Sequence, residues 1–122
     1  MTTHRRDIPA LPDLVFAAAV EPQRLADWLP PPLDVVGLAE DDILILRHQG
    51  RLTQVRLAAD FDHLRLTWES LADPTRRGAL TVSPLGAGHS VAELEVEPDD
   101  QEFAGRLLDA LAKEVEATFT AG

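Results

Sequence analysis

One segment near the C-terminal end constrains the fold more than any other, because its side chains alternate strictly between apolar and acidic. The apolar positions are Ala92, Leu94 and Val96, and the acidic positions are Glu93, Glu95 and Glu97. Successive side chains of a β-strand point to opposite faces, so this pattern predicts a strand over 90–97 in a sheet with one dry and one wet face. Such a sheet needs a cover on its dry face.

The cover is expected directly after this strand. Apolar residues recur there at the spacing of one helix face, and Asp99 and Glu102 have the spacing of a capping box at a helix start. The apolar stripe is formed by Phe103, Leu107, Leu108, Leu111, Val115 and Phe119. We therefore expect a long C-terminal helix that ends near Thr118 and packs its apolar stripe on the sheet.

Between Leu33 and Glu97 the hydrophobic pattern is that of strands, with turn residues about every ten positions. This spacing predicts an antiparallel meander with strands at 33–38, 43–48, 51–59, 64–69, 78–83 and 90–97. The short, polar segment Thr2–Ile8 is predicted to be an edge strand.

Two short helices are predicted between the edge strand and the meander. Pro12 suits the first position of a helix over 12–20, and Pro22 suits that of a second helix. The second helix must end at Pro30–Pro32, because proline cannot continue a hydrogen-bonded turn. The element order is therefore strand, two short helices, five or six strands and a long helix, which is an α+β fold.

Length, cysteine content and charge narrow the class of protein. A chain of 122 residues has the size of one domain, and we expect a single domain over 1–122. It has no cysteine, which excludes disulfides, thiolate nucleophiles and cysteine-based zinc sites. A net charge of −10 argues against nucleic acid and anionic membranes as partners of this acidic protein. Since no stretch has the pattern of a membrane span or signal peptide, a cytoplasmic location is expected.

The register of one hairpin sorts the side chains between the two faces of the sheet. If Gln49–Gly50 forms a two-residue turn, Leu46 lies opposite Thr53 and Leu44 lies opposite Val55. The predicted inner face then comprises Leu44, Leu46, His48, Thr53, Val55, Leu57, Ala59, Leu64, Leu66, Trp68, Leu80, Val82, Leu94 and Val96, with Ser90 at one end.

This inner face offers little for catalysis, since it carries no carboxylate, no lysine and one histidine. No Ser/His/Asp set, paired acids or His-x-His spacing is present, so neither a catalytic group nor a metal or other cofactor is expected. His48 is interpreted as a rim or core histidine, or as a polar anchor for a ligand. Trp28 and Trp68 are interpreted as core residues first and as ligand contacts second.

Four segments resemble, in the same order, those of a known family. They are VFAAAVEPQRLADWL at 15–29, LRLTWE at 64–69, VSPLGAG at 82–88 and LLDAL at 107–111. On these residues the chain resembles the START-like superfamily (SRPBCC), in particular its branch similar to the activator of heat-shock-protein-90 ATPase and to polyketide cyclases. The resemblance covers nearly the whole chain. It implies the helix-grip fold, in which a curved antiparallel β-sheet wraps a long C-terminal helix and encloses an apolar cavity.

The inner face and the resemblance together favour a protein that binds a small hydrophobic molecule and has no obvious catalytic residues. The expected ligand-binding residues are Trp28, Leu46, His48, Thr53, Val55, Leu66, Trp68, Leu107 and Leu111.

Other functions stay open. In an enzyme of the polyketide cyclase or dehydratase type, His48 would transfer a proton and Thr53 would be its hydrogen-bond partner. In a co-chaperone-like protein, the acidic strand that carries Glu93, Glu95 and Glu97 would meet a basic protein partner. A packed domain without a ligand is a further alternative, and a homodimer through an exposed edge strand is open as well.

Overall fold

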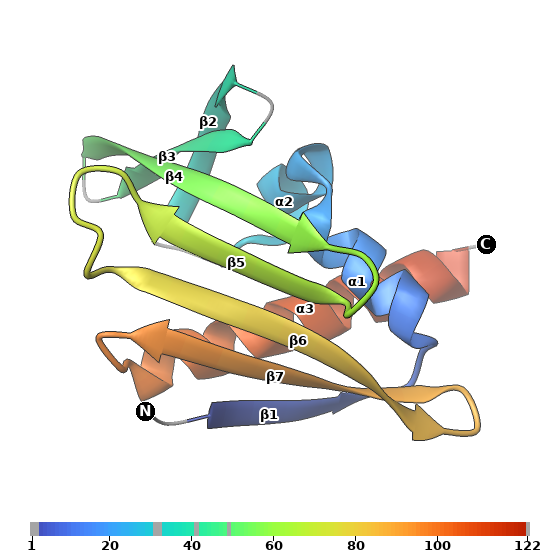
Figure 1. The fold of residues 1–122 in the computed structure, drawn as a ribbon. Helices are drawn as coiled ribbons and strands as arrows, with labels where there is room; N and C mark the ends of the chain where they lie inside the picture. The colour runs from blue at the N-terminus through green and yellow to red at the C-terminus, as the bar shows by residue number, and fades with distance from the viewer. Residues whose placement is uncertain (1–2, 31–32, 41, 49, 122) are drawn as a thin grey trace.

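The elements follow one another in the predicted order (Figure 1) over the residues that the computed structural model describes, 3–30, 33–40, 42–48 and 50–121. The strands are β1 (Thr3–Ile8), β2 (Leu33–Glu40), β3 (Ile43–His48), β4 (Arg51–Asp60), β5 (Arg65–Ser70), β6 (Arg77–Gly86) and β7 (His89–Glu97). The helices are α1 (Pro12–Val20), α2 (Pro22–Trp28) and α3 (Gln101–Ala121). The prolines that were predicted to open the two short helices do so.

The strands form one antiparallel seven-stranded sheet in the order β1-β7-β6-β5-β4-β3-β2. Strands β2 to β7 are a meander and β1 is an edge strand, as predicted, and the neighbour of β1 is β7. The predicted register of β3 and β4 is also confirmed, since Leu46 pairs with Thr53 and Leu44 pairs with Val55. Gln49, in the predicted turn, lies outside the described residues.

The long helix α3 has a different N-cap residue from the one that the capping-box spacing predicts. The carboxylate of Asp100 accepts a hydrogen bond from the backbone N–H of Phe103 at 3.0 Å, so Asp100 is the N-cap residue and Asp99 is not. Asp99 Oδ1 instead lies 2.9 Å from Nε2 of His4 in β1. The start of the helix is thereby tied to the edge strand. The side chain of Phe119, expected at the end of the stripe, lies outside the described part of the chain.

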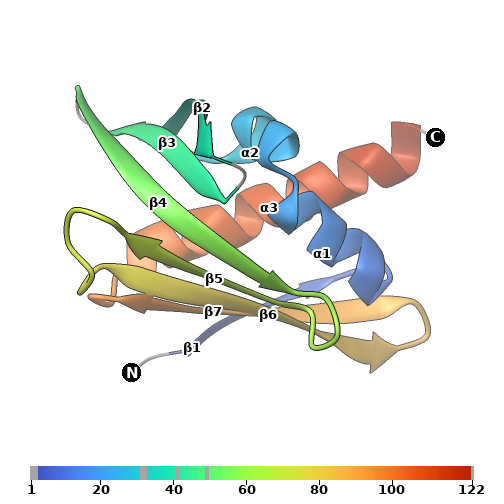
Figure 2. The ribbon, with the colours of Figure 1, turned by 45° about the horizontal axis from the view of Figure 1, so that its top comes forward.

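The core lies between α3, α1 and one half of the sheet (Figure 2). Helix α3 packs chiefly on β1, β7 and α1, and α1 also packs on β5, β6 and β7. The inner face of β6 and β7 is nearly inaccessible there, with exposed fractions of 3% or less at Leu80, Val82, Ala92 and Leu94. Ser90 is fully buried at the end of this face and donates a hydrogen bond to the carbonyl oxygen of Ala10 at 2.6 Å.

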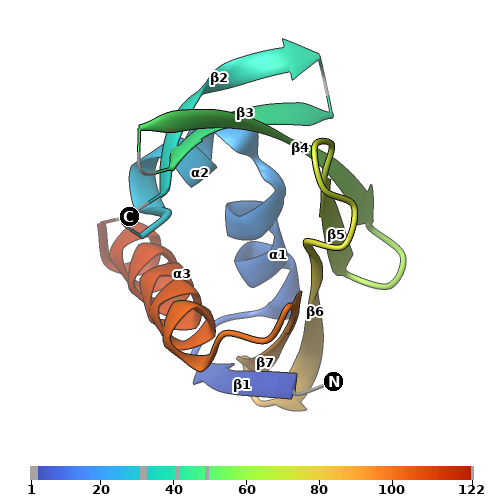
Figure 3. The ribbon, with the colours of Figure 1, turned by 90° about the vertical axis from the view of Figure 1, so that its left-hand side faces the viewer.

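Seen along the strands, the sheet curves around α1 and α3 (Figure 3). This is the helix-grip arrangement that the resemblance implies, and it leaves the convex face of the sheet turned outward. In the part of the chain that the structure describes, no helix combines the length and the apolar character that crossing a bilayer requires.

Candidate ligand-binding site

The inner face of the sheet is sealed on one half and partly open on the other. On β6 and β7 it is buried, and so are Leu44 and Leu46 of β3 and Leu66 of β5. Other apolar side chains of the same face, on β2, β4 and β5, are only half-buried, and so is Phe103 in the first turn of α3. These residues, the open apolar surface, are Leu33, Val35, Val55, Leu57, Trp68 and Phe103. They lack a full cover because α3 packs chiefly on β1 and β7, at the other end of the strand order.

The predicted ligand-binding residues divide between the core and this surface. Five of them are buried in the hydrophobic core, namely Trp28, Leu46, Leu66, Leu107 and Leu111. Thr53, Val55 and Trp68 are half-buried, and Val55 and Trp68 belong to the open apolar surface. His48 ends β3 opposite Arg51, and its side chain is outside the described part.

Trp28 has a structural role that uses its polar atom. Its indole Nε1–H donates a hydrogen bond to the carbonyl oxygen of Ala18 at 2.9 Å, and its side chain is only 8% exposed. The bond joins the end of α2 to α1. Trp28 therefore behaves as a core residue, which was the first interpretation of this side chain.

Trp68 owes its position to a glycine on the neighbouring strand. Gly78 pairs with Trp68 across β5 and β6, and a Cβ atom built on Gly78 would lie 2.3 Å from Cζ2 and 2.5 Å from Cε2 of the indole. Real Cβ atoms essentially never approach other atoms so closely. The indole thus occupies the space that any other residue would fill at position 78.

Four residues of the open apolar surface were absent from the predicted site, namely Leu33, Val35, Leu57 and Phe103. The sequence carried a signal for each of them. Leu33 and Val35 alternate with polar or exposed neighbours, Leu57 was placed on the inner face, and Phe103 began the helix stripe. What the pattern lacked was the position of α3, which decides which inner residues stay accessible.

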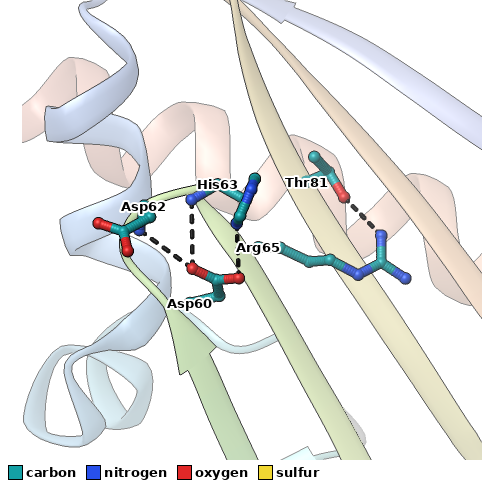
Figure 4. Close-up of polar contacts among 5 residues, drawn as sticks. All are labelled: Asp60, Asp62, His63, Arg65 and Thr81. Carbon is teal, nitrogen blue, oxygen red and sulfur yellow. Dashed lines mark hydrogen bonds and ion pairs between the residues drawn. The ribbon is translucent and has the colours of Figure 1, made fainter.

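Titratable groups within the described residues gather away from this surface. No three His, Cys, Asp or Glu side chains among the described residues are placed to hold a metal ion. Asp60 ends β4 and His63 lies in the exposed β4–β5 loop, with 2.8 Å between Oδ2 of Asp60 and Nδ1 of His63 (Figure 4). The hydrogen bond from His63 lowers the pKa of Asp60, and Asp60 also accepts bonds from the backbone N–H groups of Asp62 and His63. These hydrogen bonds hold the β4–β5 loop in its conformation.

The acidic outer positions of β7 are interleaved with arginines. Glu93 lies 3.2 Å from Arg5 of β1, and Glu97 lies 3.0 Å from Arg77 of β6, both measured between side-chain nitrogen and oxygen. The fold thus neutralises two of the three glutamates that the sequence predicted as a stripe for a basic partner.

A small hollow of about 260 Å³ lies between α2 and α3 and is lined by Asp27, Trp28, Ala110, Lys113 and Glu114. Beside it, Arg24 and Glu114 form a half-buried ion pair with a nitrogen–oxygen distance of 3.7 Å. The hollow between α2 and α3 is therefore lined by charged side chains and by the buried Trp28.

Residues 2–122 match the family described as Polyketide cyclase / dehydrase and lipid transport. Among curated proteins no sequence matches the chain significantly.

Three solved structures share the fold. The di-domain ARO/CYC StfQ from the steffimycin biosynthetic pathway has a TM-score of 0.73 at 16% identity, over 98% of this chain and 46% of that protein. Norcoclaurine synthase from Thalictrum flavum, in complex with dopamine and hydroxybenzaldehyde, has a TM-score of 0.66 at 18% identity, over 94% and 85% of the two chains. A START superfamily protein from Mycobacterium smegmatis has a TM-score of 0.65 at 15% identity, over 98% and 97%.

Proposed function

Since the chain belongs to the polyketide cyclase/dehydrase and lipid transport family of the START-like superfamily, we propose that it binds a small hydrophobic molecule against the open apolar surface. The observation that carries this proposal is the half-buried state of that surface. Apolar side chains that stay accessible on the inner face of a sheet gain free energy when a ligand removes them from water, at about 25 cal/mol per Å².

The polarity of the surface limits the chemistry of the ligand. Among the described side chains on the inner face of β2 to β5, the half-buried polar ones are the hydroxyls of Thr53 and Ser70. The register also places Arg51 on this face, where it is exposed at the end of β4, and no carboxylate or lysine lies there. A charge on the ligand that is buried against the half-buried side chains would find no counter-charge among those side chains. We therefore expect an uncharged, mostly apolar molecule with one or two groups that hydrogen-bond to hydroxyls.

A catalytic role of the cyclase or dehydratase type is the second candidate. The register favours it in one respect, since His48 pairs with Arg51 at the end of β3 and β4, and Thr53 lies two residues along β4 from Arg51. His48 would transfer a proton and Thr53 would hold it in position. Unchanged turnover of an aromatic polyketide substrate by His48→Ala would eliminate this mechanism.

The binding proposal is tested by blocking the surface from one strand. Val55 and Leu52 both lie on β4 but on opposite faces, and Leu52 is 64% exposed. Val55→Trp should fill the open apolar surface, whereas Leu52→Trp adds the same side chain outside. Thermal-shift and tryptophan-fluorescence titrations would use a fatty acid, a sterol, a flavonoid and an aromatic polyketide.

The expected result is that at least one probe raises the melting temperature of the wild type and of Leu52→Trp, and that Val55→Trp loses this response while still melting cooperatively. If no probe shifts the wild type, or if Val55→Trp responds like the wild type, the proposal is wrong. In the first case the domain is packed without a ligand.

A further inference from the structure

The outer face of the sheet carries side chains in three rows that run across the strands. The first row, from β4 to β7, is Arg56, Glu69, Arg77 and Glu97. The middle row is Ala58, Thr67, Ala79 and Glu95. The third row is Asp60, Arg65, Thr81 and Glu93. From β4 to β6, two rows of long or polar side chains therefore flank a middle row of small ones.

This arrangement leaves an open hollow of about 460 Å³ on the outer face. The hollow is lined by the middle row, by the first row, by Arg65, and by the neighbouring pair Trp68 and Gly78. Its three rows lie on the opposite side of the sheet from the open apolar surface, and Trp68 is the one residue that belongs to both.

Strands β4 and β5 each carry opposite charges on the two sides of the middle row. On β4, Arg56 belongs to the first row and Asp60 to the third. On β5 the order is reversed, with Glu69 in the first row and Arg65 in the third. The charge pattern is thus antisymmetric about the middle row on both strands.

The charges of these two strands are only partly matched inside the chain. Arg65 Nη1–H donates to the hydroxyl of Thr81 at 2.9 Å, a neutral partner (Figure 4). Arg56 lies 3.7 Å from Asp42, a long and exposed ion pair. The carboxylate of Glu69 makes no hydrogen bond or ion pair with any residue that the structure describes.

We propose that this outer face pairs with the same face of a second copy of the chain, about a two-fold axis that runs along the middle row. That rotation lays each strand over its counterpart in the opposite direction. Arg65 then faces Glu69 of the second copy. Arg56 faces Asp60 of the second copy, whose carboxylate is also hydrogen-bonded to His63 of its own chain, and each contact occurs twice. A two-fold axis parallel to the strands would instead place Arg65 on Arg65, so the charges select one orientation.

The curvature of the sheet keeps the acidic strand out of this contact. The outer face is convex across the strands, so β7 and β1 recede from the centre at β5 (Figure 3). The same rotation places Glu93 opposite Glu97 and Glu95 opposite Glu95 of the second copy. Glu93 and Glu97 are each paired with an arginine of their own chain. The two hollows join into a channel along the axis, which water fills as in other polar interfaces.

The test exchanges charges on β5 and measures self-association by sedimentation at about 0.15 M salt, where the net charge is screened beyond about 8 Å. Arg65→Glu and Glu69→Arg should each raise the dimer dissociation constant roughly tenfold or more, since each places two pairs of like charges in contact. The double variant Arg65→Glu/Glu69→Arg restores opposite charges and the original net charge, so it should dimerise like the wild type.

Two control variants change the net charge by the same amounts on another surface. Arg106→Glu and Glu102→Arg lie on the exposed side of α3 and should leave the dissociation constant unchanged. A wild type that stays monomeric at millimolar concentration would overturn the proposal. So would a dimer that tolerates Arg65→Glu, or one that the double variant fails to restore.

Discussion

The contact between Gly78 and Trp68 allows a quantitative prediction for Gly78→Ala. The added Cβ would lie 2.3 Å and 2.5 Å from two indole carbons of Trp68 and 2.9 Å from the backbone oxygen of Glu95. The indole can be displaced, but the backbone of β7 is held by β6 and β1 on either side. Overpacking of this kind costs about 1–3 kcal/mol.

A gain opposes this cost, because alanine loses less backbone entropy than glycine in a strand, by about 0.5–1 kcal/mol. The clash outweighs the gain, since it involves a large ring and a fixed carbonyl. We expect a net loss of about 1–2 kcal/mol, which corresponds to a fall in Tm of roughly 4–8 °C for a domain of this size.

Urea denaturation followed by circular dichroism measures this loss, and tryptophan fluorescence reports whether Trp68 moves. Gly37→Ala is the matched control, because Gly37 is also in a strand and nothing lies within 4 Å of its added Cβ. The double variant Gly78→Ala/Trp68→Leu should recover part of the loss and not all, since the contact with Glu95 remains. A Gly78→Ala protein within 0.5 kcal/mol of the wild type would refute the reasoning, on a scale where surface changes cost about that much.

Three further predictions concern polar contacts. Ser90→Ala removes a buried hydrogen bond and leaves the carbonyl of Ala10 without it, so urea denaturation should show a loss of about 1–3 kcal/mol, and a loss under 0.5 kcal/mol would contradict this. Asp100→Ala removes the N-cap of α3 and should cost about 1 kcal/mol, with Asp99→Ala costing less. His63→Ala should raise the pKa of Asp60 toward its ordinary value in an NMR titration. Because the folded pKa of Asp60 is lowered, its contribution to the free energy of unfolding is present above the unfolded pKa and is lost as pH falls through the folded pKa. The dependence of the free energy of unfolding on pH in this range should therefore be weaker in His63→Ala.

The parts of the fold that follow from local chemistry were predictable from the sequence. Pro12 opens its helix and His48 ends its strand at the predicted positions, because the residue types that begin a helix or bound a strand act on their immediate neighbours. The N-cap of α3 was not predictable in this way. Asp99 and Asp100 are adjacent acids, and what separates them is the contact of Asp99 with His4, 95 residues away.

The sequence predicted which residues of the candidate site share the inner face of the sheet, but not which of them stay accessible there. Strand alternation placed Val55 and Leu66 on the same inner face, as the structure shows. Their difference in burial depends on where α3 lies across the sheet, which is set by packing on β1 and β7. The stripe of α3 contains the same leucines whichever half of the sheet it covers, so no pattern within the helix determines that choice.

The pairing of β1 with β7 also bears on how the chain is made. Arg5 and Glu93 are 88 residues apart in sequence, so β1 leaves the ribosome long before the strand beside which it belongs. Until then β1, which carries the apolar Ile8, has no strand to pair with, and α3 lacks one of the two strands on which it packs. Contacts of such separation are formed late and slow the folding of a domain. We therefore expect nascent chains that stop before β7 to remain dependent on chaperones, and the native state to be acquired in one step after synthesis of α3.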